Sequence, residues 1–381
     1  MKQCKLKILK YLIPLLAISL VGCKNEEITQ QQETPKDIIE QKIDKMTIDE
    51  KIGQMILAGF NGTQTNQYTN TLINDFKVGG VILFTRNIES SQQLKKLTTD
   101  INKSNNNIPL FISVDEEGGR VSRLPDDVFK FPKASEVGQI NDENYAYENG
   151  KKLGNTLNEH GINMDHAPVI DIYSNPKNTV IGDRAFGTDE NIVSKMGIAT
   201  MKGLEDANVI PTVKHFPGHG DTEVDSHFGL PIVNKSLEEL KSFEFIPFKK
   251  AIENNCDVIM VSHIILDKID NTNPSSLSKK IITDILRNDL GFNKVIMTDD
   301  MNMAAITNNM SVEKASTESI KAGSDIILIG NNVEIVKAVI EEIKLAVDSN
   351  EISETRINES VYRILKLKEK YKILKTDTSN L

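Results

Sequence analysis

Cysteine is scarce in this chain of 381 residues, which has three cysteines and no tryptophan. Cys4 and Cys23 lie close to the N-terminus, and Cys256 alone lies in the body of the sequence, in an apolar context. One cysteine cannot form a disulfide within the body of the chain. The fold must therefore rest on an apolar core rather than on covalent cross-links.

Basic residues are also in the minority, with 45 Lys and Arg against 54 Asp and Glu and a formal net charge of -9. Residues 1–22 carry four lysines and no acid, so their removal takes the charge to -13. A nucleic-acid partner needs a basic face that neutralises phosphates. The charge balance therefore argues against nucleic acid as a partner.

The apolar run that follows the first ten residues, YLIPLLAISLVG, is too short to span a bilayer comfortably as a helix. It follows the basic stretch MKQCKLKILK, which is the pattern of an export signal. The string LVGC at its end resembles the lipobox of bacterial lipoproteins. This resemblance implies a signal peptide over 1–22, lipidation of Cys23 and a lipid anchor on the extracytoplasmic face of the cell membrane. The alternative is an ordinary secretory signal with an incidental cysteine.

Residues 23–37 form a polar segment after the expected cleavage site, and this segment lacks aromatic side chains. Such a composition cannot bury a core, so we expect a lipidated cysteine followed by a flexible tether. The body of the protein is then expected over 38–375, as one domain without repeats.

Short apolar runs alternate with stretches of helical period throughout this body. The expected strands are 56–60, 79–84, 109–115, 162–168, 209–216, 257–263, 294–300 and 324–330. Near-continuous apolar strands between helices indicate a parallel sheet covered on both faces, and eight of them indicate an α/β fold of the closed (β/α)8 TIM-barrel type. A doubly wound open sheet is the alternative, but no G-x-G-x-x-G follows the first strand and no phosphate loop is present. The segment 334–374 is expected to be a helical tail packed on the barrel.

Polar side chains gather where five consecutive expected strands end, which is where such barrels place their active sites. They are Asp115, Asp165 with His166, Lys214 with His215, His263, and Asp299 with Asp300. A single buried acid or histidine at a strand end is more often structural than catalytic. Five strand ends with the same property favour an active site.

Four strings resemble signatures of glycoside hydrolase family 3, in its β-N-acetylhexosaminidase branch. They are DEEGGRVSRL (115–124), IGDRAFG (181–187), KHFPGHGDTEVDSHFGLP (214–231) and TDDMNM (298–303). The similarity extends in order from about residue 40 to about residue 372. The fourth strand reads NMDHAP where the family more often has an asparagine-aromatic-alanine-proline string, so the role of His166 stays open.

The resemblance implies a retaining mechanism in which Asp299 is the nucleophile and His227, oriented by Asp225, is the acid/base. Retaining glycosidases need a carboxylate on one face of the sugar and a proton donor at the leaving oxygen. Imidazole suits the second role because its ordinary pKa is near neutrality, and a nearby carboxylate fixes its tautomer. Asp300 is the rival nucleophile, although alternation along a strand turns it to the opposite face. The alternative for Asp225 is a turn cap beside an exposed His227.

Substrate-binding roles follow for Lys214, His215, Asp115 and Arg184, with an Asp115–Arg184 ion pair as the structural alternative. His219 lies four residues after His215, but the string lacks the helical H-E-x-x-H context of a zinc site. We therefore expect no metal and suppose that His219 braces the loop. The role of His263 stays open.

The resulting hypothesis is a monomeric, cofactor-free, lipid-anchored exo-β-N-acetylhexosaminidase. It would hydrolyse terminal N-acetylglucosamine from cell-wall-derived saccharides through a covalent glycosyl-aspartate, as in peptidoglycan turnover. The alternatives are a β-N-acetylglucosaminide phosphorylase, a glycan-binding lipoprotein with the same fold, and a metal-dependent hydrolase.

Overall fold

The computed structural model describes residues 37–104, 108–223, 225–226 and 229–374. Among them, eight parallel strands form one sheet in the order β10-β1-β2-β3-β4-β5-β7-β9. The strands are β1 (Ile56–Gly59), β2 (Gly80–Leu83), β3 (Phe111–Val114), β4 (Met164–Asp165), β5 (Ile210–Phe216), β7 (Val258–Val261), β9 (Val295–Thr298) and β10 (Ile327–Ile329). Each lies within the run of residues from which it was predicted.

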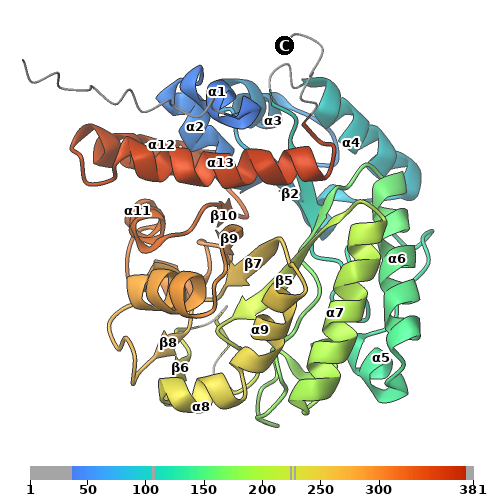
Figure 1. Ribbon diagram of the computed structural model, residues 1–381. Helices are drawn as coiled ribbons and strands as arrows, with labels where there is room; N and C mark the ends of the chain where they lie inside the picture. The colour runs from blue at the N-terminus through green and yellow to red at the C-terminus, as the bar shows by residue number, and fades with distance from the viewer. Residues whose placement is uncertain (1–36, 105–107, 224, 227–228, 375–381) are drawn as a thin grey trace, which may run out of the picture. The chain divides into compact units, whose positions relative to one another are not determined.

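The sheet closes on itself between β9 and β10, the two ends of the strand order. β1 pairs with β2 on one side and with β10 on the other. Met297 of β9 forms a parallel bridge with Ile326, and the N–H of Thr298 donates to the carbonyl of Ile326 at 3.0 Å. The expected (β/α)8 barrel is therefore confirmed, with strands at its centre and helices outside them (Figure 1).

All eight strands are buried, which explains why their sequences read as continuous apolar runs. Close contact between β1 and the end of β10 requires a glycine, because a Cβ on Gly59 would lie 2.0 Å from the carbonyl oxygen of Gly330. The barrel is thus tightly packed where β1 and β10 meet.

Helices follow most of the strands. Their bounds are α1 (Ile38–Asp44), α2 (Ile48–Gln54), α3 (Gln67–Asn70), η1 (Thr71–Asp75), η2 (Thr85–Asn87), α4 (Ser91–Ser104), α5 (Ala134–Ile140), α6 (Glu143–Glu159), η3 (Gly182–Arg184), α7 (Glu190–Asp206), α8 (Leu237–Ser242), α9 (Phe245–Glu253), η4 (Ser275–Leu277), η5 (Lys280–Asp289), α10 (Ala304–Thr307), α11 (Val312–Ala322), α12 (Val333–Asp348) and α13 (Glu354–Lys370). Within these described residues no helix is long and apolar enough to cross a membrane.

Two local features of the structure are not visible in the sequence pattern. The segment 235–255 forms two helices, because α8 ends before Phe243, whose backbone (φ -146°, ψ -78°) is not helical, and α9 begins at Phe245. A short parallel pair, β6 (Ile232–Val233) and β8 (Ile265–Leu266), adds a small second sheet beside the barrel. Two-residue strands carry too few alternating positions to be recognised in a sequence.

The helical tail packs on the barrel at its amino end, the end from which the strands start. Lys368 of α13 is fully buried, and its ammonium group donates to Gln54 Oε1 and to the carbonyl of Gly79, each at 2.8 Å. Because Gly79 directly precedes β2, this contact fixes α13 against the start of the strands. Burial lowers the pKa of Lys368 well below its ordinary value.

A buried carboxylate joins the same tail to the strands. Asp325, just before β10, is fully buried and accepts from the N–H of Ile296 at 3.0 Å. Its carboxylate is 2.7 Å from Arg287 of η5 and 3.0 Å from Arg363 of α13. These cations outweigh burial and lower the pKa of Asp325. Asp325 is therefore a structural group at the end of the barrel opposite to its expected active site.

We expect Asp325→Asn to lower the free energy of unfolding by about 3–5 kcal/mol, because it leaves buried guanidinium groups without their anion. Urea denaturation followed by circular dichroism measures this loss. The matched control is Asp75→Asn, which makes the same carboxylate-to-amide change at an exposed position. Its free energy of unfolding should stay within about 0.5 kcal/mol of that of the parent. Equal stabilities of the two variants would contradict the structural role of Asp325.

Candidate active site

A pocket of about 310 Å³ lies at the carboxyl ends of the strands. Five residues predicted from the sequence line it together: Asp115, Arg184, Lys214, His215 and Asp299. They come from segments up to 184 residues apart in the chain, and the barrel brings them together because parallel strands end at the same edge.

Lys214 is the centre of the charged groups in this pocket. Its side chain is only 3% exposed, and Nζ lies 2.7 Å from Asp115 Oδ1 and 2.7 Å from Glu117 Oε1. Burial by itself would lower the pKa of Lys214, but the two carboxylates outweigh it and raise the pKa. Lys214 is therefore held as a cation whose position is set by two anions.

Glu117 also pairs with Arg184, and this contact differs from the Asp115–Arg184 ion pair considered from the sequence. Arg184 Nε donates to Glu117 Oε2 at 2.7 Å, and Arg184 Nη2 donates to Oε1 at 2.8 Å. Burial raises the pKa of Glu117, but Arg184 and Lys214 outweigh it and bring the pKa to about 2. Such a two-point contact fixes the plane of the guanidinium group.

His215 is held on both ring nitrogens. Nδ1 lies 2.6 Å from Oδ2 of the buried Asp171, and Nε2 lies 3.3 Å from Arg184 Nη2. A carboxylate only accepts and a guanidinium only donates, so the hydrogen-bonding pattern places a proton on Nδ1 and the lone pair on Nε2. His215, which the sequence predicts as a substrate-binding residue, therefore accepts from Arg184 in this structure.

The adjacent acids Asp299 and Asp300 differ in their surroundings. Asp299 Oδ1 accepts from the N–H of Asp300 at 2.8 Å. Burial raises the pKa of Asp299, but His263, the N–H of Asp300 and the Lys214 cation outweigh burial and lower it. Asp300 Oδ1 accepts from the N–H groups of Gly330 at 2.9 Å and Asn302 at 3.0 Å, and burial raises its pKa. Asp300 thus fixes backbone at the pocket edge, while Asp299 is the acid favoured in its ionised form.

The other histidines at the strand ends have protein partners. His166 is fully buried and its Nε2 lies 3.1 Å from Ser113 Oγ, while burial lowers its pKa to about 4. His263 contacts Ser276 Oγ through Nδ1 and the carbonyl of Asp300 through Nε2. His166 is therefore a neutral group beneath the pocket, and His263 supports the backbone that carries Asp299.

The ring of His219 joins two parts of the loop after β5. Its Nδ1 lies 2.8 Å from Thr222 Oγ1 and its Nε2 lies 3.2 Å from Ser226 Oγ. Ser226 is 2% exposed, and its carbonyl accepts from the N–H of Ala305. Ser226 stands between the two predicted residues of the acid/base pair. Asp225 is half-buried beside it, and His227 lies outside the described residues.

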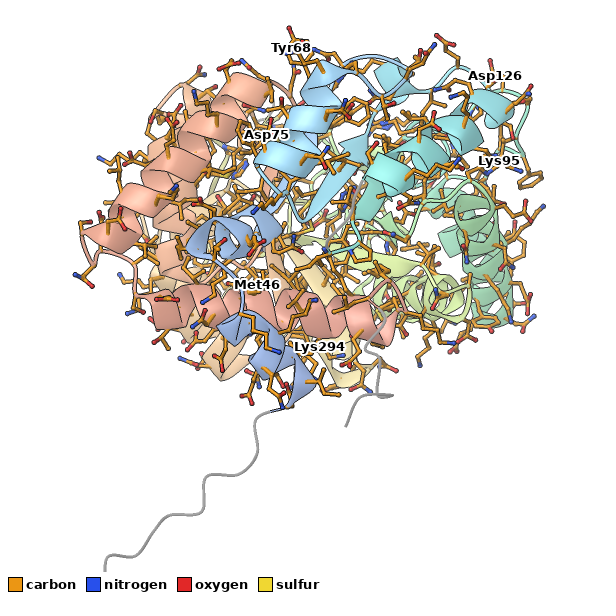
Figure 2. The ribbon with its side chains drawn as sticks, turned by 90° about the horizontal axis from the view of Figure 1, so that it is seen from above. Met46, Tyr68, Asp75, Lys95, Asp126 and Lys294 are labelled. Carbon is orange, nitrogen blue, oxygen red and sulfur yellow. The ribbon has the colours of Figure 1, made fainter. Side chains whose placement is uncertain are left out.

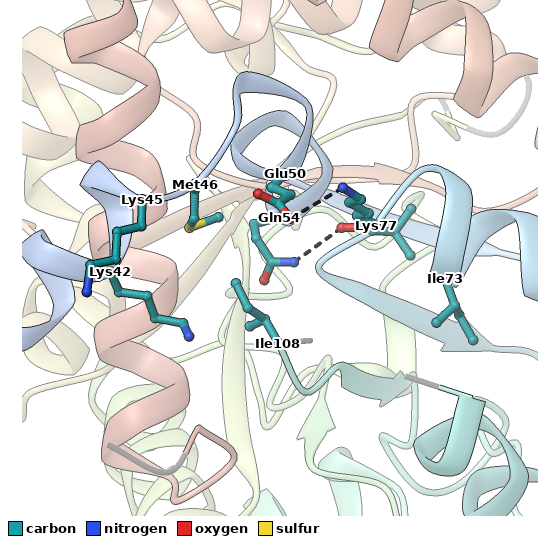
Figure 3. Close-up of a pocket in the computed structure, with 9 residues that line it drawn as sticks. Lys42, Lys45, Met46, Glu50, Gln54, Ile73, Lys77 and Ile108 are labelled. Atoms are coloured by element: carbon teal, nitrogen blue, oxygen red, sulfur yellow. Dashed lines mark hydrogen bonds and ion pairs between the residues drawn. The ribbon is translucent and has the colours of Figure 1, made fainter. Parts of the chain in front are cut away.

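A hollow of about 260 Å³ at the amino end of the barrel lies between α1, α2 and the segment before β2 (Figure 3). It is at the amino end of the barrel, close to Gln54, which contacts the buried Lys368. Lys42, Lys45 and Lys77 line it, and Glu50, which is 3.3 Å from Lys77 Nζ, is the one carboxylate among its described lining residues. It lacks the paired acids that glycoside cleavage needs, so we place the active site at the other end.

Comparison with known proteins identifies the family of this chain. The profile of the Glycosyl hydrolase family 3 N terminal domain matches residues 47–367. The chain belongs to glycosyl hydrolase family 3. The match contains every residue placed in the pocket above.

Several relatives in family 3 are named for one activity. Beta-hexosaminidase A of Pseudoalteromonas piscicida is 34% identical over 325 residues, which are 78% of this chain and 54% of that protein. Beta-hexosaminidase of Nitrosomonas eutropha is 35% identical over 280 residues, 72% of this chain and 80% of that protein. A solved family 3 beta-N-acetylglucosaminidase from Paenibacillus superposes with a TM-score of 0.85 at 38% identity, covering 88% of this chain and 65% of that one. This chain thus spans about half to four-fifths of these relatives.

Sequence reasoning missed two acids that organise this family 3 pocket. Glu117 stands two residues after Asp115 in the string DEEGG, and Asp171 ends the string APVID. Both follow strands, which is the signal that identified the other residues. Arg123 also lines the pocket, and its Nε has no hydrogen-bond partner within the described part of the chain.

His215 and His219, at the end of β5 and in the loop after it, are the residues for which metal binding is the alternative role. Within the described residues, no group of three or more His, Cys, Asp or Glu side chains is arranged to hold a metal ion. The two histidines of the loop are committed elsewhere, because His215 contacts Asp171 and His219 contacts Thr222 and Ser226. That the enzyme needs no metal stays a prediction.

We expect Ser226→Ala to loosen the loop, because it removes the hydroxyl that meets His219. One net hydrogen bond is worth about 1 kcal/mol, so amide hydrogen exchange at residues 219–223 and at Ala305 should rise roughly fivefold. Exchange followed by mass spectrometry measures this. Ser349→Ala, at an exposed serine after α12, is the matched control and should leave these amides unchanged. Unchanged exchange in both variants would show that Ser226 does not hold the loop.

Proposed function

We propose that this protein is a retaining exo-β-N-acetylhexosaminidase that releases terminal N-acetylglucosamine by hydrolysis. The observation that carries the proposal is the position of Asp299 at the end of β9, in a polar pocket of a family 3 barrel. The beta-hexosaminidase names of its relatives support the choice of sugar.

In the first step of the proposed reaction, Asp299 attacks the anomeric carbon of the sugar. The bond from this carbon to the leaving oxygen breaks, and His227 gives its proton to that oxygen. The lowered pKa of Asp299 supports a nucleophilic role, since only the carboxylate form attacks. The rigid strand behind Asp299 and the hydrogen bond from the Asp300 N–H favour one orientation of its carboxylate.

In the second step, water attacks the anomeric carbon of the glycosyl-enzyme. His227 takes a proton from this water, and the bond between the sugar and Asp299 breaks, which restores both groups. Asp225 orients His227 in this proposal. The anchoring of Ser226 supports it, because a fixed residue between Asp225 and His227 limits how far the pair can move from the pocket.

The charged groups of the pocket are proposed to hold the sugar hydroxyls. Asp115 accepts, while Lys214 and Arg184 donate, and Glu117 fixes both cations before substrate arrives. Preorganised polar groups of this kind bind a sugar without reorganising during the reaction. Arg184 orients His215, whose ring lies within the same pocket.

We expect Asp299→Asn to lower kcat on an aryl β-N-acetylglucosaminide by about 10⁴-fold or more, because the amide cannot form the glycosyl-enzyme. The fold should be retained, as judged by circular dichroism. A 2-fluoro sugar with a good leaving group should label Asp299 of the parent enzyme, and mass spectrometry of the peptides locates the label. Asp300→Asn is the matched control. A label found on Asp300 would show that Asp300, and not Asp299, is the nucleophile.

We further propose that the enzyme is anchored by lipid at Cys23 and acts on cell-wall-derived saccharides. The sequence pattern before Cys23 supports the anchor, and Cys23 lies outside the described residues. An enzyme held on the outer side of the membrane meets wall fragments as substrates.

Cys23→Ala should move the protein from the membrane fraction to the medium or block removal of the signal, because no thiol remains to carry lipid. Fractionation with and without detergent, followed by immunoblotting, measures this. Cys256→Ala is the control and should stay with the membrane, because Cys256 is buried in the barrel. Membrane association of Cys23→Ala equal to that of the parent would refute the anchor.

A further inference from the structure

A second polar pocket, of about 390 Å³, lies at the same end of the barrel as the active site. It is lined by Gly59, Phe60 and Asn61 after β1, by Tyr68 and Leu72, and by 331–334 at the start of α12. Figure 2 labels Tyr68 on the side away from Lys294, which directly precedes β9 and marks the amino end. The pocket therefore lies at the carboxyl ends of β1 and β10, next to the strand that carries Asp299.

The two pockets share a wall. Gly330 follows β10, and a Cβ on it would lie 2.2 Å from Asp300 Oδ2, so its backbone touches the residue next to Asp299. Arg86 crosses the same wall, because it donates to the carbonyls of Phe60 at 3.1 Å and Gly330 at 2.5 Å. Its guanidinium lies 4.3 Å from the ring centre of Phe84, which lines the active-site pocket. The two pockets are therefore neighbours, with the backbone of Gly330 and the side chain of Arg86 between them.

The lining of the second pocket suits an uncharged sugar ring. Tyr68 is 59% exposed, although an aromatic ring of this size is usually more buried. A tyrosine offers an apolar face for the C–H side of a pyranose and a hydroxyl at its tip. The amide groups of Asn61, Asn331 and Asn332 border the same space.

The charge and hydrogen-bonding groups of this pocket indicate which chemical class of ligand it can bind. The side-chain oxygens of Asn331 and Asn332 already accept from backbone N–H groups, at 2.8 Å and 3.0 Å, which leaves their NH₂ groups as donors for hydroxyls. Glu334 is the one charged residue among the described residues that line the pocket. A pocket with one carboxylate and no cation disfavours phosphate or carboxylate ligands and tolerates a neutral sugar.

We propose that this second pocket binds an uncharged N-acetylhexosamine ring on the leaving-group side of the cleaved bond. The proposal rests on the exo-acting glycosidase function, since an exo-enzyme holds only the terminal sugar in its catalytic pocket. Every further ring of the substrate then belongs to the leaving group. Tyr68 stacks on that ring and is a specificity residue that does not touch the reacting atoms.

The test compares Tyr68→Ala with Tyr68→Phe, which keeps the ring. kcat/KM is measured on an aryl β-N-acetylglucosaminide and on the β-1,4-linked trimer of N-acetylglucosamine. Tyr68→Ala should lower kcat/KM roughly 5–10-fold more for the trimer than for the aryl substrate, since an aromatic contact is worth about 1 kcal/mol beyond the area it buries. Tyr68→Phe should lose less than twofold. Tyr145→Ala, at another exposed tyrosine, should match the parent on both substrates.

Binding separates this proposal from the proposed function. The trimer is titrated calorimetrically into Asp299→Asn enzyme with and without Tyr68→Ala, which needs no turnover. A rise in Kd of about 5–10-fold on loss of the Tyr68 ring supports the second pocket even if the parent hydrolyses neither substrate. Equal Kd values, equal losses on both substrates, or no binding of the trimer would overturn it.

Discussion

The site depends on the ion pairs that the ammonium group of Lys214 forms with Asp115 and Glu117. A buried cation is costly unless it is paired, and here two carboxylates at 2.7 Å compensate it. Glu117, one of the two, also orients Arg184, and Arg184 contacts His215. Removal of any one of these charges takes a partner away from another buried charge. The pocket is therefore one linked set of groups rather than a collection of separate ligands.

Stability and chemistry are placed at opposite ends of this barrel. At the amino end, Asp325 and Lys368 are saturated by backbone and side-chain partners that tie α13 to the strands. At the carboxyl end, Asp299 lines a pocket, and its pKa is lowered by neighbours rather than by a structural salt bridge to one cation. This division agrees with the general behaviour of (β/α)8 barrels.

The sequence was sufficient to predict the barrel and the main residues of the pocket, because both follow from local patterns. Apolar runs such as 209–216 mark buried strands, and a polar residue at the end of a run must lie at the mouth. The partners of these residues were less predictable. Arg184 pairs with Glu117 rather than Asp115, and the break between α8 and α9 depends on the backbone of Phe243, because both are decided by three-dimensional packing. The position of His227 stays a prediction.

The capping residue of the first helix also bears on how a substrate reaches the pocket. Asp37 caps α1, and its carboxylate accepts from Tyr362 Oη at 2.9 Å and lies 3.2 Å from Lys366 Nζ, both on α13. Because α13 is fixed to the start of the strands through Lys368, the chain joins the barrel at its amino end. An anchor placed before Asp37 would hold the barrel by that end. The mouth of the pocket lies at the other end of the barrel, so an attachment at Asp37 is made away from the mouth.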